Sequence, residues 1–125
     1  MTQDEQELIG LLAYFYLQNG RAEKAEILLT ALDILVPNQT WTLSTLAFAQ
    51  IRANHPDLSL KTLDRLAMIG RMDAFFHLMR MQALAAQNRP EEAEQARAIY
   101  LSLRSGTAEL SPIEADFPPS SQAKG

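Results

Sequence analysis

The chain has 125 residues, of which 47% are hydrophobic, and this is enough apolar material for one packed domain. Its net charge of −4 argues against a nucleic-acid partner, and the absence of cysteine excludes a disulfide scaffold and favours the cytoplasm. The first residues are acidic, unlike those of a secretory signal, and the longest apolar run, residues 11–17, is too short to span a bilayer. We therefore expect a cytoplasmic protein without stable membrane insertion.

The distribution of glycine, asparagine and proline predicts six helices in an all-α fold. In chain order the predicted helices occupy about residues 5–19, 22–35, 41–53, 56–69, 74–87 and 90–104. Thr40 is the expected cap of the third helix, Pro37 ends the second and Gly70 ends the fourth. We expect the helical domain to cover residues 1–106, and we expect the proline- and serine-containing residues 107–125 to form a disordered tail.

The sequence repeats itself with a period of 34 residues. At this offset Gly20, Asn54 and Asn88 fall in one column, and these residue types tolerate the left-handed backbone that is needed just after a helix. Pro56 and Pro90 come two residues later, where proline suits the first turn of the next helix. Three units, at about residues 6–39, 40–73 and 74–107, are therefore predicted to be a helix, a tight turn and a second helix.

The turn segments 20–25 and 88–93 resemble the G-x-x-x-x-A turn of tetratricopeptide repeats, although Ser59 and Arg71 depart from the pattern in the second unit. The resemblance implies three stacked helix pairs in a short right-handed superhelix, with the first helix of each pair lining a concave groove. The positions expected to line this groove are Leu11, Tyr14, Leu17, Trp41, Phe48, Ile51, Arg52, Phe75, Leu78, Met79 and Gln82.

This groove would carry a continuous strip of large apolar side chains, and such a strip usually marks a partner site. We expect it to hold an amphipathic helix or an extended apolar segment of another polypeptide. The alternative is that some of these residues are interior, although the second helices already supply a core. The expected core residues are Leu28, Leu29, Leu32, Leu60, Leu63, Leu66, Ile99 and Leu103. A second possibility for Ile99 and Leu103, together with Tyr100, is an uncovered edge at the C-terminal end of the repeats.

The sequence contains no arrangement of residues typical of a catalytic, cofactor or metal site, so we expect neither enzymatic activity nor a cofactor. His55 and His77 have no metal-ligand neighbours at helical spacing. The acidic clusters at residues 4–7 and 91–94 are interpreted as solvated helix starts rather than as acid/base pairs.

Residues 8–36 also resemble the small tetratricopeptide chaperones of bacterial type III secretion, most closely the YscY-like (SctY) group. Segments 17–20 and 27–32, together with Ala25, carry this likeness. The resemblance implies a cytoplasmic chaperone without ATPase activity. Its partner would be one small secreted component of the export apparatus, a YscX-like (SctX) protein, whose apolar C-terminal region it would keep soluble and help to engage the export gate protein. A heterodimer with this client and a homodimer both remain open.

Three alternatives to this client or function stay open. Chaperones of translocator or needle subunits share the same architecture. A general tetratricopeptide scaffold or adaptor would bind peptide tails through charged clamps, for which Arg52 is the main candidate on the groove face. The chain is also compatible with a subunit of an enzyme complex whose catalytic centre lies on another chain.

Overall fold

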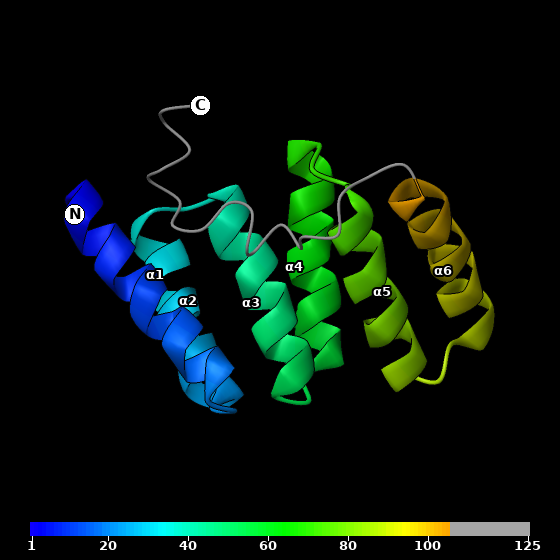
Figure 1. Ribbon diagram of the computed structural model, residues 1–125, viewed down its shortest axis with the longest axis horizontal. Coiled ribbons are helices and arrows are strands. Elements are labelled where there is room, and N and C mark those ends of the chain that lie inside the picture. The colour runs from blue at the N-terminus through cyan, green and yellow to red at the C-terminus, as the bar shows by residue number, and fades with distance from the viewer. Residues whose placement is uncertain (106–125) are drawn as a thin grey trace.

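The structure is a computed structural model and describes residues 1–105. These residues form six α-helices that follow one another along the long axis of the molecule (Figure 1). The helices are α1 (Gln3–Gln18), α2 (Ala22–Leu35), α3 (Thr40–Arg52), α4 (Pro56–Ile69), α5 (Ala74–Ala86) and α6 (Pro90–Arg104). The all-α prediction is confirmed for this part of the chain, and every helix ends within two residues of its predicted boundary. The predicted disordered tail, residues 107–125, lies outside the described residues.

The three predicted tight turns have one common backbone geometry. Gly20, Asn54 and Asn88 have φ angles of 73°, 67° and 58°, in the left-handed region that these residue types tolerate. In each turn the amide after this residue donates to the carbonyl five residues before it, and this bond satisfies one of the free carbonyls at the helix end. The three bonds are Arg21 N–H to Tyr16 at 2.8 Å, His55 N–H to Gln50 at 2.7 Å, and Arg89 N–H to Leu84 at 3.0 Å.

The helix starts are capped in different ways. Thr2 and Glu5 form a reciprocal capping box at α1, and the Asp73 carboxylate accepts the amide N–H of Phe76 at the start of α5. The predicted cap of α3 is wrong, because Thr40 is the first helical residue and Gln39 occupies the cap position without a side-chain bond. The preceding Asn38 has a φ of 65°, in the left-handed region, and α3 starts one residue earlier than predicted.

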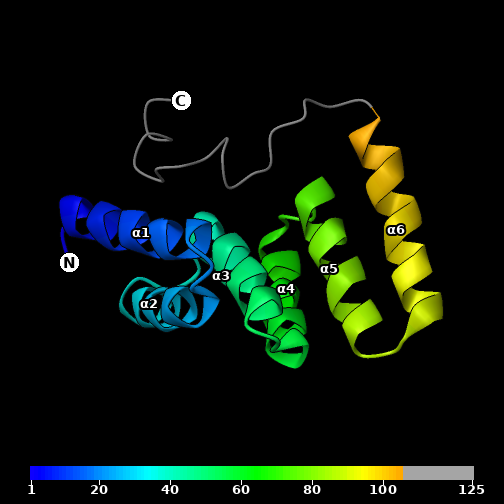
Figure 2. The same cartoon turned by 60° about the horizontal axis from the view of Figure 1, so that its bottom comes forward.

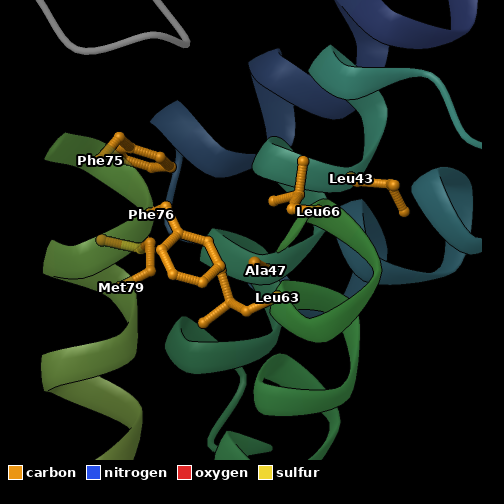
Figure 3. Packing of buried hydrophobic residues seen from close by; sticks show 7 residues of the cluster. All are labelled: Leu43, Ala47, Leu63, Leu66, Phe75, Phe76 and Met79. Atoms are coloured by element: carbon orange, nitrogen blue, oxygen red, sulfur yellow. The ribbon is translucent and has the colours of Figure 1, made fainter. Parts of the chain in front are cut away.

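Apolar clusters fill the two spaces between successive helix pairs, and Figure 2 shows the three pairs side by side. The first cluster joins the first pair to α3 through Ala13, Ala25, Leu29, Trp41, Leu46 and Ala49. The second joins the second pair to α5 and includes Leu43, Ala47, Leu63, Leu66, Phe75, Phe76 and Met79 (Figure 3). Helix α3 lies between both clusters, so its residues 41–47 are all buried.

The predicted core of the second helices is correct for the first two pairs and wrong for the third. Leu29, Leu32, Leu63 and Leu66 are buried, and Leu28 and Leu60 are half-buried. Ile99 and Leu103 are 44% and 39% exposed, because α6 is the last described helix and no helix pair lies against its outer side. Their exposure agrees instead with the alternative interpretation, in which they belong to an edge at the C-terminal end of the repeats that no described helix covers.

Polar side chains add specific links between α2 and the second pair. The Arg65 guanidinium donates to both carboxylate oxygens of Asp33, at 2.6 and 2.9 Å. Burial would raise the pKa of Asp33, but hydrogen bonds from Arg65 and from the Asn38 amide outweigh burial and lower it. His55 Nδ1 lies 2.9 Å from the Glu26 carboxylate. These contacts fix the first pair against the second.

Candidate partner-binding face

A hollow of about 280 Å³ lies between α1 and α3. Its lining consists of Tyr14, Leu17, Gln18, Phe48 and Arg52, and we call these five residues the α1–α3 hollow. Tyr14, Leu17 and Phe48 are half-buried and supply apolar walls, whereas Gln18 and Arg52 are exposed near the C-terminal ends of their helices. The helical repeat positions the five side chains, because residues three or four apart on each helix share one face.

Phe48 connects this hollow to the core. Its ring packs against the second apolar cluster and lies 6.3 Å from the ring of Phe75, centroid to centroid. On the solvent side the Arg52 guanidinium lies 5.6 Å from the centre of the Phe48 ring, which is within the range of a cation–π interaction. The hollow therefore has a preformed apolar wall with one positive charge held beside it.

The structure brings four of the predicted groove residues together in this hollow: Tyr14, Leu17, Phe48 and Arg52. Gln18 completes the lining. Gln18 falls in the same repeat column as the predicted residue Arg52, so the 34-residue period already indicated that Gln18 faces the groove. Leu11 and Gln82 are exposed elsewhere on α1 and α5, and Ile51 and Leu78 pack, half-buried, against the second apolar cluster.

The prediction of a continuous exposed strip is wrong, because Trp41, Phe75 and Met79 are core residues with exposures of only 4%, 7% and 2%. The Trp41 ring packs on Gly10 of α1 so closely that a Cβ at Gly10 would lie 3.3 Å from it. Phe75 and Met79 fill the second cluster between α5 and the second pair. Trp41, Phe75 and Met79 therefore point toward the preceding helix pair rather than into the groove. The 34-residue repeat shows which residues are equivalent, but it does not show which of these two directions they take.

Neither histidine belongs to the hollow. His77 is buried, with its ring edge-on to Phe76 at 4.9 Å between centroids. Burial lowers the pKa of His77 and the charge of Arg80 lowers it further, against a smaller opposing effect of Asp73. His77 is therefore a neutral packing residue near pH 7. Within residues 1–105 no group of three or more histidine and carboxylate side chains is placed to hold a metal ion.

Comparison of the chain with protein-family models and with curated proteins finds no match. Among the described helices, none combines the length and the apolar character that crossing a bilayer requires. Function is therefore inferred from the helical-repeat fold, from the α1–α3 hollow and from the resemblance of residues 8–36 stated above.

Proposed function

We propose that this protein is a chaperone that shields an apolar segment of another polypeptide by binding it over the α1–α3 hollow. The observation that carries the proposal is the composition of this hollow, in which three large apolar side chains form the walls and Gln18 and Arg52 offer polar groups at the rim. Aromatic and arginine side chains of this kind contribute most of the binding energy in many protein interfaces.

The open shape of the hollow favours side chains of a bound segment over a small molecule. Pockets for drug-sized ligands bury most of the ligand's surface, whereas this hollow of about 280 Å³ is open to solvent. An apolar side chain of the partner would enter between Tyr14 and Phe48, and an acidic group beside it would meet Arg52. The partner is therefore an amphipathic segment with acidic residues flanking its apolar face.

The resemblance of residues 8–36 to YscY-like chaperones supports a client from bacterial type III secretion. On this proposal the client is a small secreted YscX-like (SctX) protein, and binding takes place in the cytoplasm before the client reaches the export gate protein. Covering the client's apolar segment removes from water the surface that would otherwise drive aggregation. The same reasoning covers a translocator or needle subunit as an alternative client.

The proposal is tested by co-expressing the full chain with the YscX-like protein of the same bacterium and measuring complex formation by size-exclusion chromatography with light scattering. Phe48→Glu and Arg52→Glu alter the hollow, and Met68→Glu is the matched control because Met68 is 88% exposed on α4. We expect the wild type and Met68→Glu to bind the client in equal molar amounts, whatever the mass of the assembly. We expect both hollow variants to bind about tenfold more weakly or worse.

Phe48 also packs on the core, so its variant needs a circular dichroism spectrum and a melting temperature close to those of the wild type. Arg52 is exposed, and its variant tests the hollow without touching the core. Equal affinities of all four proteins would place the client elsewhere and overturn the assignment. A loss of binding in Arg52→Glu alone would favour the adaptor with a charged clamp over the chaperone.

A further inference from the structure

The outer side of α1 is an apolar face that no other described helix covers. Leu8, Leu12 and Phe15 are 66%, 42% and 58% exposed. Their spacing of four and three residues places them in one stripe along the helix, and we call this stripe the N-terminal edge. None of the three belongs to the α1–α3 hollow, so this surface is separate from the proposed client site.

The repeat shows what kind of surface this edge is. At offsets of 34 and 68 residues its side chains match six residues of α3 and α5. The matches are Leu8 with Thr42 and Phe76, Leu12 with Leu46 and Arg80, and Phe15 with Ala49 and Ala83. Five of the six are at most 5% exposed, and Arg80 is half-buried. The N-terminal edge thus carries the residues of a repeat-to-repeat interface, but no described helix pair lies against it.

The complementary surface lies at the other end of the molecule. A second hollow of about 280 Å³ is formed by α5 and α6 and is lined by Met81, Ala85, Asn88, Pro90, Ala93, Glu94 and Arg97. Three of these residues, Met81, Ala93 and Arg97, occupy the columns of Ala13, Ala25 and Leu29. In the first pair those three residues are fully buried in the cluster shared with α3. The α5–α6 hollow is therefore the place where the first helix of a following repeat would pack.

Charge distinguishes the two ways in which copies of this chain can meet. Residues 1–39 contain six acidic and two basic side chains, a net charge of 2 − 6 = −4. Residues 74–105 contain four arginines and three glutamates, a net charge of 4 − 3 = +1. Two first pairs facing each other would bring together two segments with a net charge of −4, whereas a first pair against the third pair brings together −4 and +1. Within the α5–α6 hollow itself Glu94 and Arg97 pair with each other at 3.2 Å, so this preference comes from the helices around it.

We infer that the N-terminal edge of one copy packs into the α5–α6 hollow of a second copy, so that copies stack head to tail. Helix α1 of the first copy then lies on the third pair of the second copy, as α3 lies on the first pair within one chain. Phe15 is larger than its counterpart Ala49, and the hollow has a volume of about 280 Å³. Because such a contact joins two different surfaces, it does not close on itself, and the assembly grows with concentration.

Sedimentation equilibrium of the full chain over a range of concentrations tests this inference. Phe15→Glu alters the N-terminal edge, Ala85→Glu alters the α5–α6 hollow, and Met68→Glu again serves as a control on an exposed residue outside both. If Phe15→Glu loses helical content in circular dichroism, Leu8→Glu is used in its place. We expect the average mass of the wild type and of Met68→Glu to rise with concentration. We expect each edge variant alone to weaken association about tenfold or more.

The decisive sample is the mixture of the two edge variants. Phe15→Glu keeps an intact α5–α6 hollow and Ala85→Glu keeps an intact N-terminal edge, so together they form a dimer that cannot grow further. If Ala85→Glu alone still dimerises, two N-terminal edges meet and the head-to-tail arrangement is wrong. A wild type that stays monomeric at every concentration overturns self-association altogether. Both results leave the test of the client site unaffected.

Discussion

Trp41 gives the most direct test of how the helix pairs are held together. Trp41 is only 4% exposed, and it lies in the cluster that joins the first pair to α3. Truncating a buried tryptophan to alanine removes its transfer free energy and leaves a cavity, at a cost of about 3–5 kcal/mol. Since domains of this size are stable by about 5–15 kcal/mol, Trp41→Ala should remove a large part of the free energy of unfolding.

The assay is urea denaturation followed by far-ultraviolet circular dichroism. With a slope of about 1–3 kcal/mol per molar urea, a loss of 3 kcal/mol moves the midpoint down by about 1–3 M. Phe48→Ala is the comparison, because Phe48 is half-buried beside the α1–α3 hollow and should cost less stability than Trp41→Ala. A loss below about 1 kcal/mol for Trp41→Ala would refute its placement in the core.

Gly10 extends this prediction to a pair of residues. A methyl group at Gly10 would lie 3.3 Å from the Trp41 ring, closer than ordinary packing, so Gly10→Ala forces the ring to move in the wild type. The gain in helix propensity, about 0.5–1 kcal/mol, applies in both backgrounds. In the Trp41→Ala background, however, the same methyl group meets a cavity instead of the ring. Gly10→Ala should therefore be more favourable in the Trp41→Ala background than in the wild type, and simple additivity of the two substitutions would contradict the contact.

Three further predictions concern single polar or turn residues. Ser59→Ala removes the hydrogen bond that the Ser59 hydroxyl donates to the buried Ala47 carbonyl at 2.9 Å, and urea denaturation should show a loss of about 1 kcal/mol. Because the pKa of Asp33 is lowered in the folded protein, its carboxylate stabilises the folded state at pH values above the unfolded pKa of about 3.9. This stabilisation is lost as the pH falls through the pKa of the folded state. Asp33→Asn should flatten this part of the pH profile of the melting temperature, and an unchanged profile would show that the Asp33–Arg65 pair does not contribute. Asn54, at a φ of 67°, should accept glycine readily, whereas Asn54→Ala should be less stable by about 1 kcal/mol in thermal denaturation; equal melting temperatures for the two variants would argue against the left-handed turn.

Local chemistry was sufficient to predict where the helices begin and end. A left-handed residue after a helix requires glycine or asparagine, and proline at a helix start needs no amide partner, so Gly20, Asn54 and Pro56 marked the boundaries directly. The 34-residue period then predicted that the helices come in pairs, because each turn recurs in the same phase. The columns of Tyr14, Leu17, Phe48 and Arg52 were also correctly predicted to lie on one face, since helical geometry fixes which residues share a side.

Only the tertiary structure decided which aromatic residues are inside. The first helix of a pair faces its own second helix, the preceding pair and solvent, and the sequence pattern does not state which of these directions a given side chain takes. In α3, packing from both sides buries every residue from Trp41 to Ala47 and removes the contrast between apolar and polar faces. The same dependence on neighbours exposes Leu8 and Phe15 at one end and Ile99 and Leu103 at the other. The sequence by itself determined the helices and their pairing, and the number and position of neighbouring helices decided which of their residues form core, hollow or edge.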